Sequence, residues 1–168
     1  MPEFSSQTPL SPSSLPDIPA VKCRACGKEF SLDRRVGTAN RNHCPHCLAS
    51  LHVDEKTGDR SSTCHGLMQA VGLTFKYAKK QKYPRIHRGK LAGELMLVHC
   101  CEACGKISVN RLAADDDTDK VLAVFKKQQT EFDQSFLDKL AAKNISLAQE
   151  EDHTEIHSQL LGNSRNTH

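Results

Sequence analysis

Residues 23–28 read CRACGK and residues 44–47 read CPHC, so the chain contains two CxxC pairs with residues 27–43 between them. Paired cysteines at this spacing are typical of a structural zinc site, in which four thiolates surround one ion. A shell filled by four protein ligands leaves no position for a substrate, so the ion serves folding and not a reaction. An iron–sulfur cluster uses the same ligand type and is the chemical alternative. We expect the first Zn²⁺ site to consist of Cys23, Cys26, Cys44 and Cys47.

The first CxxC pair is repeated further along the chain, because residues 101–106 read CEACGK. We expect the two copies to form equivalent knuckle turns, with Gly27 and Gly105 in a backbone conformation that other residues resist. A second Zn²⁺ site is therefore expected around Cys101 and Cys104, with Cys64 as its third ligand.

The fourth ligand of this second site is left open by the sequence. His99 is favoured because residues 93–99 alternate like a strand, and residues two apart on a strand share a face, which puts His99 and Cys101 together and Cys100 on the other side. The competing interpretation of His99 is a hydrogen-bonded structural histidine. The other candidate donors are Cys100, His65 and His52. The expected second site is Cys64, His99, Cys101 and Cys104.

The composition indicates that the fold needs this metal. The chain has 168 residues and eight cysteines, but no tryptophan and only 5% aromatic residues, so the side chains that normally dominate core burial are scarce. The N-terminal stretch contains no apolar run of the secretory type, so we expect a reducing, cytoplasmic setting in which cysteines bind metal. No run reaches the roughly 18 apolar residues of a membrane-spanning helix, so a soluble protein without a membrane partner is expected.

The chain divides into four regions that differ in amino-acid composition and pattern. Five of the seven prolines lie in the first twenty residues, which therefore predict a disordered leader. Apolar residues later in the chain recur at roughly helical spacing and predict a helix over Thr118–Lys143. The expected regions are a Pro/Ser-rich leader at 1–20, a zinc-binding domain at 21–117, an amphipathic helical extension at 118–149, and a flexible polar tail at 150–168. The expected fold class is small α+β, with a zinc-ribbon-like β-hairpin core carrying zinc knuckles and a C-terminal α-helix.

Residues 41–45 read RNHCP, and this region resembles the RNHCP-domain family, small bacterial proteins named for that pentapeptide. The resemblance continues through the second CxxC pair to Asp54, and it includes GDR at Gly58, CxG at Cys64, the histidine and CxxCG near His99, and NRLAxDD ending at Asp116. It covers a little over half of the chain. The resemblance implies a domain but no reaction or ligand, and the leader and C-terminal segment lie outside it. Cys100 departs from it, since a basic residue is expected there.

The net charge of +3 hides three regions of different sign. Residues 1–20 carry −2, residues 21–112 carry +10, and residues 113–168 carry −5. Within the basic part, residues 76–90 read KYAKKQKYPRIHRGK, with seven bases, no acids and two tyrosines. Cations neutralise phosphates and tyrosines stack on unpaired bases, although a solvated loop would have the same composition. The expected nucleic-acid-binding residues are Arg41, Lys76, Tyr77, Lys79, Lys80, Lys82, Tyr83, Arg85, Arg88 and Lys90.

These observations predict a noncatalytic zinc-binding module that binds RNA, in a ribosomal or translational setting. One alternative is a zinc-dependent hydrolase or nuclease, with His43, His46 or His52 as base and an open position in the second metal site. Another is a protein-docking adaptor that uses the apolar face of the C-terminal helix. The polar residues of the RNHCP region could hold the zinc turns in place or form a contact surface for a ligand.

Overall fold

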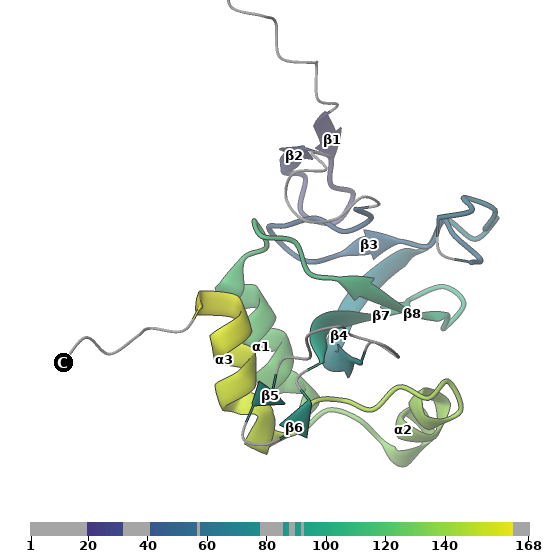
Figure 1. Cartoon of the computed structure of the whole chain (residues 1–168). Helices are drawn as coiled ribbons and strands as arrows, with labels where there is room; N and C mark the ends of the chain where they lie inside the picture. Colours follow the sequence, from purple (N-terminus) through teal and green to yellow (C-terminus); the bar gives the residue numbers. More distant parts are fainter. Residues whose placement is uncertain are drawn as a thin grey trace, which may run out of the picture.

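The computed structural model describes residues 20–31, 41–56, 58–77, 86–87, 90–91 and 93–162. Its centre is a four-stranded antiparallel sheet in the order β3–β4–β7–β8 (Figure 1). These strands are β3 (Ser50–Leu51), β4 (Leu67–Lys76), β7 (Glu94–Cys101) and β8 (Ile107–Arg111). Two small hairpins accompany the sheet, β1 (Ala20–Lys22) with β2 (Glu29–Ser31), and β5 (Ile86–His87) with β6 (Lys90–Leu91). With its helices and cysteine knuckles this is the small α+β fold that the sequence predicted.

Strand β7 lies in the middle of the molecule because both of its faces are buried. Leu95 and Leu97 belong to one core cluster, while Val98 belongs to a second cluster that also contains Ile107 of β8. Successive side chains of a strand point to opposite faces, so a strand covered on both sides has a continuous apolar sequence. Strand β7 ends at Cys101, so the CEACGK turn at residues 101–106 starts at the edge of the core.

Three α-helices in the described part of the chain cover the sheet. They are α1 (Thr118–Gln128), α2 (Gln134–Ala141) and α3 (His153–Leu161), the last preceded by the short 3₁₀ helix η2 (Glu150–Asp152). Helices α1 and α3 lie side by side against one face (Figure 1), where Val121 and Ile156 share a core cluster with Leu97. Helix α2 adds Leu140 to the cluster around Val98.

The single helix expected over Thr118–Lys143 is two helices. Helix α1 ends at Gln128, and α2 starts behind Asp133, whose carboxylate accepts a hydrogen bond from the backbone N–H of Phe136 at 2.9 Å. Aspartate is a favoured N-cap because its side chain satisfies an amide that the first helical turn leaves free. The apolar spacing does indicate helix, but the Asp133 cap starts a second helix within the expected range.

The flexible tail expected at 150–168 is also corrected. Residues 150–152 form η2, and α3 follows as far as Leu161, with Ile156 fully buried against α1 and the sheet. Ile156 and Leu160 stand one helical turn apart, and both contact the core. Residues 163–168 lie outside the described part of the chain, and so does the expected leader except for Ala20.

The segment between α2 and η2 covers the outer edge of β4. Leu147 forms an isolated antiparallel bridge with Thr74, and the backbone N–H of Ala148 donates to the carbonyl of Leu73 at 2.8 Å. The amide of Gln128 also donates to the carbonyl of Ala148 and accepts from the backbone N–H of Leu73, both at 2.6 Å. An exposed strand edge invites unwanted pairing, and this segment fills it.

None of the helices in the described ranges is long and apolar enough to cross a membrane.

Candidate metal centres

The first centre joins two turns that lie far apart in sequence. Cys23 and Cys26 flank the turn between β1 and β2, and Cys44 and Cys47 flank the turn that leads into β3. The sulfurs of Cys23 and Cys47 are 3.6 Å apart, and those of Cys26 and Cys44 are 3.8 Å apart. A tetrahedral shell with Zn–S bonds of ~2.3 Å puts its sulfurs about 3.8 Å from one another. The four thiols therefore fit one zinc ion.

Backbone amides prepare the first turn for a thiolate. The N–H groups of Ala25 and Cys26 point at the Cys23 sulfur, at 3.4 and 3.5 Å. Although burial opposes ionisation, these two amides, together with the thiols of Cys47 and Cys26, lower the pKa of Cys23 to about 7. Gly27 closes the turn with φ +74°, a left-handed conformation in which a side chain is strained.

The second centre contains the repeat of this turn. The backbone N–H of Cys101 donates to Lys106 as that of Cys23 donates to Lys28, and Gly105 has φ +72°. Burial again opposes ionisation, and the Cys104 and Ala103 amides again lower the pKa of Cys101. The equivalence of CRACGK and CEACGK is thus confirmed.

The four donors of the second centre are His52, Cys64, Cys101 and Cys104, whose ligand atoms all lie within 4.8 Å of one another. The sulfurs of Cys64 and Cys101 are 3.7 Å apart, and Nδ1 of His52 lies 3.2 Å from the Cys104 sulfur. Three thiolates and one imidazole nitrogen form a common structural zinc shell. The two groups of four fit the two zinc ions that the sequence predicted.

His99 is not the fourth donor, which corrects the expectation for this site. Its ring is completely buried between two other partners, since Nε2 donates to the carbonyl of Leu48 at 2.7 Å and Nδ1 accepts from the amide of Asn110 at 2.9 Å. Burial lowers the pKa of His99 to about 4, so the ring is neutral and one nitrogen can accept. The competing interpretation, a hydrogen-bonded structural histidine, is the one that the structure has.

His52 reaches the cysteines through the pairing of β3 with β4. Its backbone N–H donates to Gly66, and its carbonyl accepts from the N–H of His65. Gly66 is required here, because a Cβ on it would lie 2.8 Å from the Cys101 sulfur. His52 was one of the sequence candidates, but nothing in the local pattern shows which histidine the β3–β4 register brings to the cysteines. Cys100 and His65 belong to neither group of four.

The RNHCP residues fasten the first centre to the start of α1. The Arg41 guanidinium donates to Asp115 at 2.7 Å and to Asp116 at 2.8 Å, and Nε2 of His43 lies 2.9 Å from Asp116. The side chains of Arg41 and Asp116 are 1% and 2% exposed. Arg41 therefore has no free surface for a phosphate, and its expected role in nucleic-acid binding is corrected to a structural one.

Two other acidic residues of the motif region organise a loop. Asp54 accepts backbone hydrogen bonds from Gly58 and Arg60, and Asp59 accepts them from Glu55, Lys56 and Ser61. The Arg60 side chain lies 3.7 Å from Asp54 and is 58% exposed. Arg111 pairs with Glu94 at 2.7 Å.

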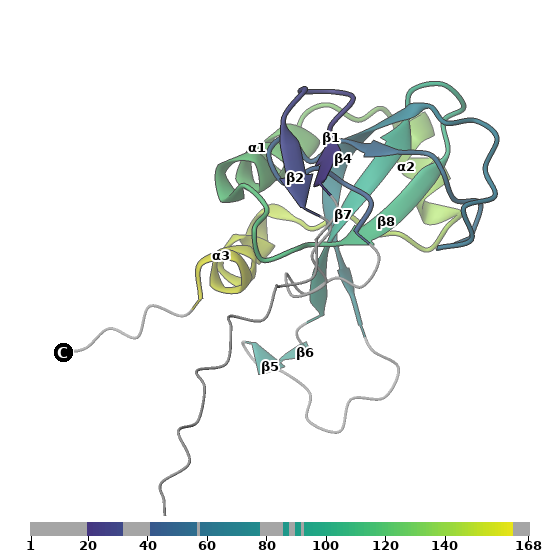
Figure 2. The ribbon, with the colours of Figure 1, turned by 90° about the horizontal axis from the view of Figure 1, so that it is seen from above.

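In the sequence, the basic segment 76–90 begins with the last residue of β4 and precedes β7, and its described strands β5 and β6 lie beyond the ends of β4 and β7 (Figure 2). Of its candidate residues, Lys76 and Tyr77 are described, and the Tyr77 side chain is exposed. A Cβ on Gly93 would lie 3.2 Å from the Tyr77 ring, so the ring covers this glycine. Lys90 lies on β6. The remaining candidates lie outside the described residues, namely Lys79, Lys80, Lys82, Tyr83, Arg85 and Arg88.

Comparison with known proteins identifies one family. The family model for the RNHCP domain matches residues 19–122, which is more than half of the chain. No curated protein and no solved structure matches. The matched range contains both groups of metal ligands and ends within α1.

Proposed function

The chain belongs to the RNHCP-domain family, and from its two centres we propose that it is a noncatalytic, cytoplasmic zinc module that binds RNA through residues 76–90. The observation that carries this proposal is the position of those residues. Residues 76–90 carry seven cations and no acid, and they begin at the last residue of β4 and lead toward β7, a strand with which β4 pairs. A basic connection between two paired strands suits a polyanion, because phosphates can bind its cations without disturbing the sheet.

The exposed ring of Tyr77 favours single-stranded RNA over duplex RNA as the ligand. Its ring covers Gly93 and its side chain is 60% exposed, so an aromatic surface stands next to the cations. Unpaired bases stack on exposed aromatic rings, whereas the bases of a duplex already stack on one another.

The metal centres support a noncatalytic role. Each has four protein donors, so neither offers the open position that hydrolysis by zinc-bound water requires. Of the three histidines considered as a base, His43 is buried against Asp116 and His52 belongs to the second centre. The docking adaptor also loses support, because Val121 and Phe125 of α1 pack into the core.

Filter binding of the zinc-loaded full chain to single-stranded RNA tests the proposal across a salt series. The triple variant K79A/K80A/K82A removes three cations from the segment. The matched variant K120A/K126A/K143A removes three exposed lysines from the helical region. We expect the first to bind at least tenfold more weakly, with a salt slope reduced by about one for each phosphate that it no longer neutralises, and the second to bind normally.

Affinity that ignores salt, or equal weakening in both variants, would contradict the proposed mechanism. A translational setting has its own test, which is co-sedimentation of the chain with ribosomes before and after RNase treatment. Loss of co-sedimentation in K79A/K80A/K82A alone is the expected result.

A further inference from the structure

Asn42 is the polar residue of the RNHCP pentapeptide whose side chain makes no hydrogen bond to the described part of the chain. Its neighbours Arg41 and His43 are tied to Asp116, and Cys44 is a metal ligand. Asn42 contributes its backbone carbonyl, which accepts a hydrogen bond from the Ser50 hydroxyl, but its side-chain amide has no hydrogen-bond partner among the described residues. An amide carries both donors and acceptors, so a free one in a cavity wall can contact a ligand.

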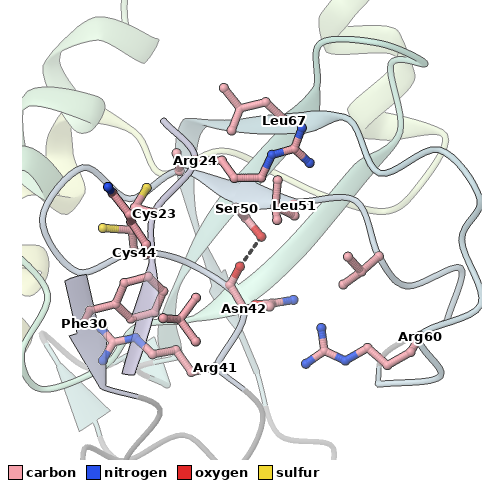
Figure 3. Close-up of a pocket in the computed structure, with 14 residues that line it drawn as sticks. Cys23, Arg24, Phe30, Arg41, Asn42, Cys44, Ser50, Leu51, Arg60 and Leu67 are labelled. Atoms are coloured by element: carbon pink, nitrogen blue, oxygen red, sulfur yellow. Dashed lines mark hydrogen bonds between the residues drawn. The ribbon is translucent and has the colours of Figure 1, made fainter. Parts of the chain in front are cut away.

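The Asn42 side chain lines a cavity of about 210 Å³ between the β1–β2 hairpin and β3 (Figure 3). The walls are apolar, formed by Val21, Phe30, Leu51, Val53 and Leu67. Pockets for drug-sized ligands begin at about 300 Å³, so this cavity suits a smaller flat group.

The exposed charged residues that line the cavity are cations. Lys22, Arg24 and Arg60 line the cavity and are exposed, and none of the described residues that line it is acidic. Figure 3 shows the Arg60 guanidinium across the same space from the Asn42 amide. The backbone of Arg60 has φ +53°, which is held by the bond from its N–H to Asp54. The cavity thus combines an apolar slot, one free amide and a cationic rim.

A neighbouring cavity provides a contrast. Asn42 and Leu51 also line it, but Asp54 and Glu55 stand there beside Lys56. The carboxylates would repel an anion, so charge complementarity favours the first cavity.

We propose that the cavity binds one nucleoside phosphate unit, with the base between the apolar walls, the Asn42 amide on the edge of the base, and the phosphate at Arg24 and Arg60. A base has flat apolar faces and a hydrogen-bonding edge, and amide side chains pair with such edges. The unit is either a free nucleotide or one residue of RNA. The second source rests on the proposed function and would add a sequence-selective contact to the binding by residues 76–90.

NMR titration of the zinc-loaded full chain tests this inference, since the absence of tryptophan removes the usual fluorescent probe. The four nucleoside 5′-monophosphates and their parent nucleosides are the ligands. We expect at least one nucleotide to shift the Asn42 side-chain resonances and to bind more tightly than its nucleoside. Asn42→Ala should weaken that binding about tenfold, the effect of removing a paired hydrogen bond to a base edge. Gln69→Ala, which removes an exposed amide elsewhere on the sheet, should not.

Two arginine variants test the phosphate site. In Arg60→Ala the nucleotide should lose part of its advantage in affinity over its nucleoside, because Arg24 remains, while Arg111→Ala, which removes an exposed arginine outside the cavity, should keep the full difference. Metal content of two ions per chain in each variant shows that the fold is intact.

The outcomes separate this inference from the proposed function. If RNA binds in a salt-dependent way but no nucleotide shifts Asn42, the cavity site is overturned and the proposed function stands. If nucleotides bind and respond to Asn42→Ala while K79A/K80A/K82A binds RNA normally, the cavity site stands and the role of residues 76–90 falls. Equal weakening by Asn42→Ala and Gln69→Ala overturns the assignment of the amide.

Discussion

At the scale of single residues, two histidines near the second centre have opposite roles. His52 presents Nδ1 to the cysteine sulfurs, while both ring nitrogens of His99 are engaged by Leu48 and Asn110. His52 has a further stabilising neighbour, because its Nε2 lies 3.5 Å from the Glu55 carboxylate, which Lys106 holds at 3.0 Å. A carboxylate behind a metal-binding imidazole orients the ring for its ion.

This difference gives the first prediction. His52→Ala should remove one ligand, so that a chelator extracts one of the two zinc ions at a much lower concentration than in the wild type. His99→Ala should keep both ions but lower the free energy of unfolding by about 2–4 kcal/mol, because it leaves a cavity and the buried Leu48 carbonyl unpaired. Chelator competition and urea unfolding measure the two effects. Loss of a zinc ion in His99→Ala alone would restore His99 as the ligand.

The second prediction concerns the carboxylates that bind Arg41. Asp116 is buried, so Asp116→Ala leaves the guanidinium without its inner partner and should cost about 3–5 kcal/mol of unfolding free energy. Asp115 makes a bond of similar length, but its side chain is 42% exposed, and Asp115→Ala should cost less than about 1 kcal/mol. Urea unfolding in the presence of zinc compares them. Equal costs would show that burial does not decide the strength of this ion pair.

The metal ligands and Arg41 show which features of the site the sequence could predict and which it could not. The spacing of the CxxC pairs identifies six of the eight ligands, because each pair carries its geometry within a few residues, and Cys64 follows as the single cysteine expected at the second site. The eighth depends on the β3–β4 register, which forms between distant residues. Arg41 resembled a phosphate ligand because its partners, Asp115 and Asp116, stand more than seventy residues away in sequence.

At the scale of elements, the edge of β4 depends on one side chain from α1. Gln128 is buried and bonds to the backbone of both Leu73 and Ala148, whereas the adjacent Gln129 is exposed and makes one longer bond of 3.4 Å. Helical spacing could predict α1, but it gives no indication that a polar residue of the helix binds a strand edge.

The third prediction compares these neighbouring glutamines. Gln128→Ala should lower the unfolding free energy by about 2–3 kcal/mol, because the backbone N–H of Leu73 loses its partner and the carbonyl of Ala148 keeps only the longer bond from Gln129. Gln129→Ala should change it by less than about 0.5 kcal/mol. Hydrogen exchange should show lost protection at Leu73 and Ala148 in the first variant only. Unchanged protection there would mean that other contacts hold the edge.

At the scale of the whole molecule, the two metal centres support different parts. The strands β1 and β2 are largely exposed, so the first centre is their main attachment to the body. The second centre joins β7 to the residues that follow β3, next to the core. The core itself contains aliphatic residues from β4, β7, α1 and α3. Aliphatic side chains thus form a larger core than the low aromatic content of the sequence led us to expect.

The fourth prediction follows from this division. Cys26→Ser should release hydrogen-exchange protection at residues 20–31 while the rest of the molecule still unfolds cooperatively. Cys104→Ser should lower the unfolding free energy of the whole body, because it frees the ends of β4 and β7 together. Native mass spectrometry should find one zinc ion in each variant. Global unfolding in Cys26→Ser would show that the first centre also supports the core.

The last prediction concerns the residues beyond the family match. The match ends at residue 122, but the core also contains residues that follow it. Ile156 of α3 is fully buried beside Val121 and Leu97, so Ile156→Ala should cost about 2–5 kcal/mol of unfolding free energy. Leu161 on the same helix is 62% exposed, and Leu161→Ala should cost less than about 1 kcal/mol. Thermal unfolding of the zinc-loaded chain measures both. If α3 were a loose tail, the two substitutions would be equally harmless, and the RNHCP domain would fold without the segment that here completes its core.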